Sequence, residues 1–233
     1  MVLDNRKIVL DTETTGLDPL NDRIIEIGCI ELINDIPSGE KLHHYFNPGN
    51  RIISDQAEQI HGLNSKFLSS FSHFEAKAEE IVKFLSDSEI IIHNVAFDLE
   101  ALNAHLRRAN LDTIKKEQCK CTLELAKKMF PGSKVNLNAL CRRYDINLDS
   151  REKHGALTDC FLLAQVYLEL TGGRQSQLKF DSTSYNNVKT QYEPTLKSPI
   201  NFETMMRIEI SEDEENKHKE LVKRIPNSIW NNL

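Results

Sequence analysis

The sequence predicts an α/β fold, a mixed sheet with helices packed on it, followed by a flexible C-terminal tail. Three consecutive apolar segments near the N-terminus, joined by short turns, read as an antiparallel meander. After the meander, amphipathic helices alternate with short buried strands, which is typical of a mixed sheet covered by helices. Residues 181–200 are polar and aperiodic, so we expect a linker there.

Composition limits the class of protein. The chain has 233 residues, of which 39% are hydrophobic, enough for one domain with a remainder or for two small domains. No run approaches the ~18–20 apolar residues of a membrane span, and residues 1–7 form no apolar signal segment. We therefore expect a soluble, cytoplasmic protein. The five scattered cysteines predict reduced thiols rather than a disulfide framework, and Cys119-Lys-Cys121 alone is weak evidence for zinc.

The charge lies unevenly along the chain. Residues 1–170 hold 20 Lys and Arg against 26 Asp and Glu, whereas residues 171–233 hold nine of each. An acidic domain grips long duplex nucleic acid poorly, because that affinity comes mainly from neutralising phosphates. If the substrate is nucleic acid, we expect a short, metal-bridged contact or a partner that holds the rest.

The predicted strands begin the chain. Residues 8–10 are consecutive aliphatics and read as a strand buried on both faces. A second strand covers residues 24–33, a turn covers 34–39, and a third strand covers 42–46. A further short buried strand is expected at residues 90–92.

Helices are expected where apolar residues recur at helical spacing, between cap and stop signals. The expected helices are 54–60 (capped by Ser54 and ended by His61-Gly62), 74–85, a helix after 93–98 that runs to about 108, 122–130, 136–143, and 156–170 before Gly172-Gly173. In the tail, residues 208–210 look strand-like. Ser211 and Glu214 form a capping box for a helix to about Arg224.

Two acids follow the first strand. Asp11 and Glu13 are spaced i and i+2, which points both side chains to the same side of a strand. Two like charges held together out of bulk water repel, and a cation such as Mg²⁺ or Mn²⁺ is the usual remedy. Thr14, Thr15 and Gly16 then turn the chain sharply. The pair taken alone is equally explained by acids that face solvent at a strand end.

Further acids are expected at the same edge of the sheet. Asp98 and Asp159 lie in the first turns of helices, and His154 precedes the second of these helices. Ends of buried strands and starts of the next helices meet along one edge. Four carboxylates can hold two divalent ions ~3.5–4 Å apart for a phosphodiester displacement, and a neutral imidazole with a reference pKa of ~6.5 can accept the proton of the attacking water.

Taken singly, each of these residues also has an explanation that needs no catalytic site. Asp98 and Asp159 are favourable helix-start acids, and His154 reads as a surface histidine before a helix. His93 reads as a satisfied histidine at a strand end, and His61 as a helix terminator.

The joint pattern resembles a known superfamily. Asp11-Thr-Glu13-Thr-Thr-Gly16, His93-Asn94-x-x-Phe97-Asp98 and His154-Gly155-Ala156-x-x-Asp159 resemble, in order and spacing, the three motifs of the DEDDh exonucleases. The resemblance covers residues 7–170 strongly and implies a 3′→5′ exonuclease domain over residues 1–173. It also implies an RNase H-like mixed sheet with helices on both faces.

The resemblance implies a role for each matching residue. Asp11, Glu13 and Asp159 would bind two divalent ions, Mg²⁺ or Mn²⁺, while Asp98 completes the site. His154 would be the general base, and nucleoside 5′-monophosphates the product. The acids Asp11, Glu13 and Asp159 would also contact the substrate.

Other matching residues would hold the terminal nucleotide. Thr14 lies in the turn beside the metals, and His61 matches a histidine that contacts this nucleotide. Gln56 stands where a glutamate is typical, which leaves a hydrogen bond to the terminal sugar without the charge. Leu17 and Phe97 would pack on the unpaired base or sugar, and such packing accepts any base.

Within the superfamily the chain most resembles the proofreading subunits of bacterial replicative polymerases, through residues 128–132, 140–144 and 166–173 and faintly to Trp230. This implies single-stranded or frayed 3′ DNA ends as substrate and a segment, residues 201–233, that docks on the polymerase (alpha) subunit. It also raises the question of a small theta-like accessory subunit. Alternatively, residues 201–233 are an independent hairpin or a disordered end.

Residues 174–180 lie between the domain and the linker of residues 181–200. They resemble a sliding-clamp-binding peptide, with Gln175, Leu178 and Phe180 as anchors. Alternatively, Leu178 and Phe180 pack on their own domain. Two rival functions remain at this point: an RNA-trimming exoribonuclease of the same superfamily, and a catalytically dead adaptor between polymerase and clamp. The intact set of four acids and one histidine disfavours the adaptor.

Overall fold

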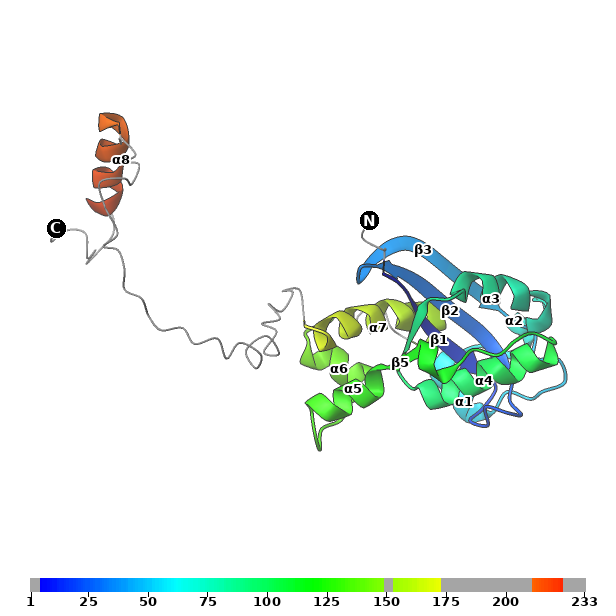
Figure 1. Cartoon of the computed structure of the whole chain (residues 1–233). Coiled ribbons are helices and arrows are strands. Elements are labelled where there is room, and N and C mark those ends of the chain that lie inside the picture. The colour runs from blue at the N-terminus through cyan, green and yellow to red at the C-terminus, as the bar shows by residue number, and fades with distance from the viewer. Residues whose placement is uncertain (1–4, 149–152, 173–210, 224–233) are drawn as a thin grey trace, which may run out of the picture. The chain divides into compact units, whose positions relative to one another are not determined.

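The computed structural model describes residues 5–148, 153–172 and 211–223 (Figure 1). These residues fall in two units, one holding residues 5–172 and one holding α8 (Glu212–Lys223), and each is described by itself. The predicted clamp peptide at 174–180, the linker at 181–200 and the strand at 208–210 lie outside the described residues. So do residues 224–233.

The first unit contains a mixed five-stranded sheet in the order β3-β2-β1-β4-β5. Its strands are β1 (Arg6–Thr14), β2 (Ile24–Ile33), β3 (Ile36–Tyr45), β4 (Glu89–Ile92) and β5 (Cys119–Cys121). The pairs β1–β2 and β2–β3 are antiparallel, whereas β4 runs parallel to β1 and β5 parallel to β4. The predicted meander followed by parallel strands is confirmed.

The turn between β2 and β3 is shorter than predicted. Only Asn34 and Asp35 form it, with φ values of 53° and 67°. Both lie in the left-handed region that Asn and Asp tolerate in two-residue hairpins. β3 therefore begins at Ile36 rather than at residue 42. Its Pro37 and Gly39 are tolerated because β3 is an edge strand.

The predicted helices of the first unit are present in their predicted order, and a short helix, Ser65–Leu68, was not predicted. The helices are α1 (Asp55–His61), α2 (Ser65–Leu68), α3 (Ala78–Leu85), α4 (Val95–Arg108), α5 (Thr122–Met129), α6 (Leu137–Arg143) and α7 (Ala156–Leu170), with 3₁₀ turns η1 (Phe74–Ala76) and η2 (Lys116–Gln118). The helix predicted over 74–85 is interrupted, because Lys77 has φ −120° and ψ 0°. Helix α5 has Cys121 at its N-cap position, and the hydroxyl of its first residue, Thr122, contacts Nδ1 of His93 at 2.9 Å.

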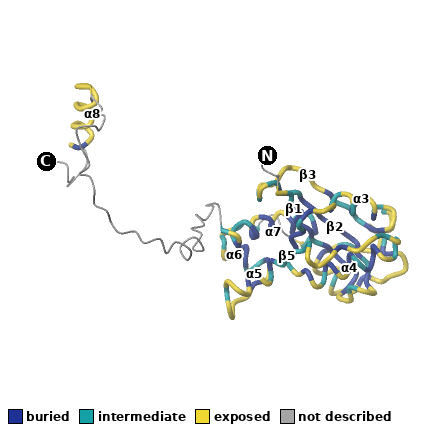
Figure 2. Tube along the Cα trace, viewed as in Figure 1, coloured by how far each residue is buried: buried dark blue, intermediate teal, exposed yellow. Residues whose placement is uncertain are grey.

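Helices cover both faces of the sheet, as predicted, and β1 divides them by its alternation. Ile8 and Leu10 are fully buried in a cluster with α3 and α4. Val9 is fully buried on the other face, in a cluster with α5, α6 and α7. Figure 2 shows the central strands buried. By the same alternation, Thr12 continues the α4 face, and Asp11 and Glu13 continue the α7 face.

The second unit is the helix α8. Ser211 and Glu214 form the predicted capping box, with Ser211 Oγ 2.8 Å from Glu214 Oε2. Lys219 pairs with Glu215 at 2.8 Å, as its i, i+4 spacing predicts. Across the parts of the chain that the structure describes, no helix combines the length and apolar character needed to cross a membrane.

Candidate active site

The end of β1 holds two acids against the start of α7. In the sheet register Asp11 lies opposite Gly28 and Glu13 opposite Glu26. Asp11 is partly buried and Glu13 is 9% exposed. A Cβ built on Gly28 would lie 2.5 Å from the backbone of Ala156 and Leu157. The first residues of α7 therefore rest directly on β2, beside the strand position of Asp11.

Helix α7 brings in two further residues. Asp159, in its first turn, is 3% exposed. The Oδ2 atom of Asp159 lies 3.4 Å from Nδ1 of His154, whose side chain is 42% exposed. One ligand atom each from Glu13, His154 and Asp159 lie within 4.8 Å of one another. Two buried carboxylates at this separation suit a divalent cation.

Asp98 reaches the same sheet edge from the opposite face. It lies in the first turn of α4, is 6% exposed, and its Oδ1 accepts a 2.8 Å hydrogen bond from Oγ1 of Thr12. Burial raises its pKa to about 6. A carboxylate held so far from water is stabilised in its charged form by a nearby cation.

The buried thiol of Cys160 marks where the acids converge. Its Sγ donates to the carbonyl of Gly28 at 3.1 Å. Burial is the main cause that raises its pKa, and the Asp11 carboxylate adds to the rise. Asp159 and Asp98 raise the same pKa further. The predicted acids thus gather around one point, although only Glu13 and Asp159 join His154 in the tightest group.

The segment that carries His154 is tied to α1. The His154 N–H donates to the carbonyl of Ile60 at 3.2 Å, and Nζ of Lys153 donates to the carbonyl of Gln59 at 2.9 Å. These carbonyls belong to the last turn of α1, which lacks intrahelical donors for them. The chain therefore places His154 by satisfying the end of the helix that also carries His61.

A cavity of about 130 Å³ adjoins the acids. Most of the residues predicted to contact the substrate line it, namely Glu13, Thr14, Leu17, Gln56, His61 and Phe97. Asp11 and Asp159 are not among the lining residues. Leu17 is 76% exposed, so its side chain is available to a ligand. Nδ1 of His61 accepts from the Leu63 N–H at 2.9 Å, and burial lowers the pKa of this histidine. The neutral ring therefore carries its proton on Nε2.

Two supporting acids were not predicted. Glu26 lies opposite Glu13, is 2% exposed, and its Oε1 lies 2.7 Å from Nε2 of His43. The sequence signal for Glu26 was the presence of an acid inside the otherwise apolar run Ile24-Ile25-Glu26-Ile27. Asp22 accepts from Oγ1 of Thr15 at 2.9 Å, and it stands behind the turn that carries Leu17.

Glycine at position 28 is required by the contact with α7. Gly28→Ala places a methyl group 2.5 Å from helix backbone, so we expect a loss of about 1–3 kcal/mol in the free energy of unfolding, measured in urea. Gly155→Ala is the matched control, because its nearest neighbour would lie 3.8 Å away. Because Gly155 is the N-cap of α7, where Gly is preferred over Ala, we expect a loss of about 0.5–1 kcal/mol, less than for Gly28→Ala. Equal stability of the two variants would refute the close contact.

Comparisons with known proteins show the family to which the chain belongs. Residues 8–167 match the sequence profile of a family described as Exonuclease. The chain is 42% identical over 229 residues to a Rickettsia felis protein named DNA polymerase III subunit epsilon, covering 94% of this chain and 96% of that protein. A protein of that name from Escherichia coli is 36% identical over 218 residues, covering 90% and 88%. The solved structure of Exonuclease X in complex with 5′ overhanging duplex DNA is similar, with a TM-score of 0.54 and 27% identity, covering 71% of this chain and 90% of that chain.

Proposed function

We infer that this chain, which belongs to the Exonuclease family and within it to the DNA polymerase III epsilon subunits, is the proofreading subunit of a bacterial replicative polymerase. The chain is a 3′→5′ exonuclease. We propose that it hydrolyses mismatched 3′-terminal nucleotides of DNA in the cytoplasm and releases nucleoside 5′-monophosphates. The observation that carries this proposal is the cavity beside Glu13, because Thr14, Leu17, Gln56, His61 and Phe97 all line it.

The acids fit a divalent-metal site. Glu13 and Asp159 are buried, with ligand atoms within 4.8 Å of each other, and burial raises the pKa of Asp98. We propose that Asp11, Glu13 and Asp159 bind two ions, Mg²⁺ or Mn²⁺, and that Asp98 completes the set. When bound, such ions supply the positive charge that stabilises the attacking and leaving oxygens of a phosphodiester displacement.

His154 is proposed as the general base. Its side chain reaches solvent, where the attacking water arrives, and its Nδ1 lies beside the Asp159 carboxylate. The imidazole would take a proton from that water while the 3′-oxygen of the preceding nucleotide leaves. The Asp159 carboxylate would stabilise the positive charge that develops on the ring.

The cavity side chains explain removal of any base. Leu17 and Phe97 offer apolar surface to the terminal nucleotide, and apolar stacking does not distinguish bases. Gln56 and the Nε2–H of His61 would bind its polar atoms. This arrangement suits proofreading, which must accept every mismatch. The proposal is tested by comparing hydrolysis rates on single-stranded DNA and RNA ends, and faster hydrolysis of RNA would replace proofreading by RNA trimming.

The tail is proposed to hold partners. Residues 1–173 would be the exonuclease domain, 174–180 a sliding-clamp peptide through Gln175, Leu178 and Phe180, and 201–233 the segment that binds the polymerase (alpha) subunit. We propose a small theta-like accessory subunit as a further partner of the first domain.

Removing residues 181–233 should separate the two activities. We expect unchanged exonuclease rates, because all acids and cavity residues lie before residue 173, and no association with the polymerase subunit in gel filtration. The full chain, assayed in parallel, is the control. Loss of both properties together would show that the division into domain and tail is wrong.

A further inference from the structure

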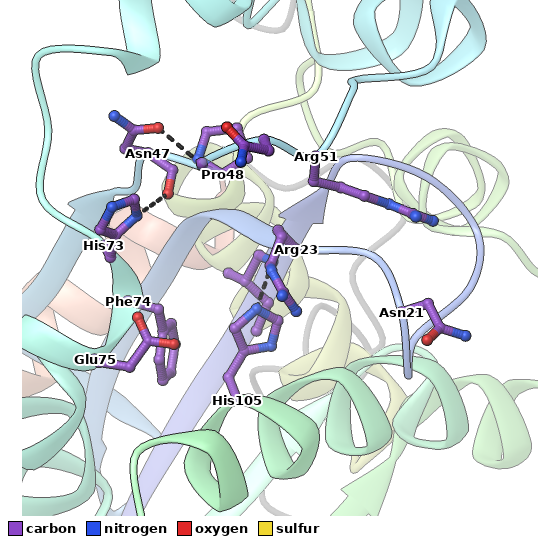
Figure 3. Close-up of a pocket in the computed structure, with 12 residues that line it drawn as sticks. Asn21, Arg23, Asn47, Pro48, Arg51, His73, Phe74, Glu75 and His105 are labelled. Atoms are coloured by element: carbon purple, nitrogen blue, oxygen red, sulfur yellow. Dashed lines mark hydrogen bonds between the residues drawn. The ribbon is translucent and has the colours of Figure 1, made fainter.

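A second, larger cavity of about 570 Å³ lies among loops of the first unit (Figure 3). Four segments line it: the β1–β2 loop, the β3–α1 loop, η1 and α4. Its volume lies within the range of small-molecule sites. None of the proposed metal ligands lines it.

Two arginines, Arg23 and Arg51, line this cavity, and Figure 3 shows Arg23 beside the ring of His105. A third arginine, Arg108, is not among the lining residues but lies near Arg23. Arg108, on the same helix as His105, donates from Nη2 to the carbonyl of Leu20. The Nη1 groups of Arg23 and Arg108 are both buried, and neither finds an acceptor among the described residues. A buried donor without an acceptor is costly, and two neighbouring cations add repulsion.

His105 carries no charge that would offset or add to the positive charge of the arginines. Its Nδ1 contacts the carbonyl of Ala101 at 2.8 Å, and its Nε2 accepts from the Ile24 N–H at 3.1 Å. Burial, and then the charges of Arg108 and Arg23, lower its pKa to about 4. The ring is therefore neutral at neutral pH. Its Nε2 holds α4 to β2, and its Nδ1 is engaged within α4.

The rim offers further groups that bind polar ligands. Asn21 and Asn50 are exposed, and Figure 3 shows Asn21 and Arg51 on one side of Arg23. Arg51 donates from Nε to Asp22 at 2.9 Å, which leaves part of its guanidinium fork for other acceptors. Glu75 is the single acid among the described lining residues, and it is exposed at the rim.

One loop connects this cavity to the proposed nucleotide site. The Thr15 N–H donates to the Arg23 carbonyl at 2.9 Å, and the Thr15 hydroxyl donates to Asp22 at 2.9 Å. Asp22 is also the partner of Arg51. Thr14 and Leu17, on either side of Thr15, line the smaller cavity. The loop from Thr15 to Arg23 therefore contributes residues to both cavities.

We propose that the larger cavity binds a nucleotide phosphate, through the guanidinium groups of Arg23 and Arg51. An arginine fork matches phosphate oxygens in a two-point contact, and an anion here would offset the repulsion between neighbouring guanidinium groups. The chain is acidic overall, with a net charge of −6, so this positive site is local rather than part of a general basic surface. The proposal rests on the proposed function. The phosphate belongs either to the backbone of the bound strand or to a free nucleotide.

Binding in chelator tests this site without hydrolysis. The full chain is titrated into a 5′-labelled single-stranded octanucleotide and followed by fluorescence anisotropy at several salt concentrations. Unlabelled nucleoside 5′-monophosphate and inorganic phosphate serve as competitors. We expect Arg23→Gln to weaken octanucleotide binding about tenfold and to reduce the salt slope by about 0.7. Asn50→Ala, at the exposed rim, is expected to weaken binding about threefold.

Lys83→Gln is the matched control, because it removes one exposed positive charge from α3, outside this cavity. It should bind as the wild type does. If Arg23→Gln also lowers the affinity for the monophosphate, the site takes free nucleotides. If it affects the octanucleotide alone, the site takes backbone phosphates. Unchanged binding of every probe by both Arg23→Gln and Asn50→Ala, or an equal loss in Lys83→Gln, overturns the proposal.

The proposed function is checked separately in the same preparations. The wild type, supplied with Mg²⁺, is assayed on the 4-nitrophenyl ester of thymidine 5′-monophosphate, a small phosphodiester. Failure to hydrolyse it counts against the proposed function alone, because the binding titration is done without metal and still decides the phosphate site. Thermal unfolding of each variant shows that the fold is retained. Arg23→Lys, which keeps the charge but loses the fork, is expected to bind between the wild type and Arg23→Gln.

Discussion

Asp159→Asn is expected to lower the rate of 3′-terminal hydrolysis by about 10³-fold or more. The substitution keeps the size of a side chain that is 3% exposed, but it removes the negative charge beside Glu13 and His154. Charge stabilisation by bound metal contributes several kcal/mol to such reactions, and about 4 kcal/mol corresponds to about 10³-fold in rate. The rate is measured on a labelled single-stranded DNA with saturating Mg²⁺.

Glu169→Gln is the control for this variant, because it makes the same change of charge near the other end of α7. We expect its rate to equal that of the wild type. A rate for Asp159→Asn within a few-fold of the wild type would mean that Asp159 does not hold the metal.

His154→Ala is expected to lower turnover by about 10²–10⁴-fold while metal binding survives. The imidazole is partly exposed and is held by the backbone bond of His154 to Ile60, so its removal should leave Glu13 and Asp159 in place. Turnover is measured on the same DNA, and Mn²⁺ affinity is measured by calorimetry on the same preparation.

The metal affinity must be measured because His154 lies close enough to Glu13 and Asp159 to be a metal ligand itself. If Mn²⁺ affinity collapsed together with turnover, His154 would be a metal ligand rather than the base. His44→Ala, on the edge strand β3, is the control and should change neither quantity.

Local signals in the sequence account for much of the fold. The meander, β4 and α7 were predictable because runs of apolar residues and cap residues report on their own surroundings. β5 was not predicted, since Cys119–Cys121 is too short to show a period. β3 begins earlier than predicted because Asn34 and Asp35, both with positive φ, close the turn in two residues. The predicted turn was longer and covered residues 34–39.

The residues of the candidate site also divide into those that the sequence could predict and those that it could not. Asp11, Glu13, Asp98, His154 and Asp159 could be proposed from the spacing of three motifs. Gly28 could not, because its requirement comes from the backbone of Ala156 and Leu157, which is distant in sequence. The arginine-lined cavity was missed for a similar reason. Arg23, Arg51 and His105 come from three separate segments, and only the folded loops bring them together.

The most direct test of the central claim is digestion of a 3′-mismatched, 5′-labelled primer on its template. The reaction is run with Mg²⁺, with Mn²⁺ and with chelator, and Asp11→Ala is run beside the wild type. The account predicts a ladder of shortened primers that requires metal and is absent in the variant. No shortening of DNA by the wild type, or equal shortening by Asp11→Ala, would contradict it.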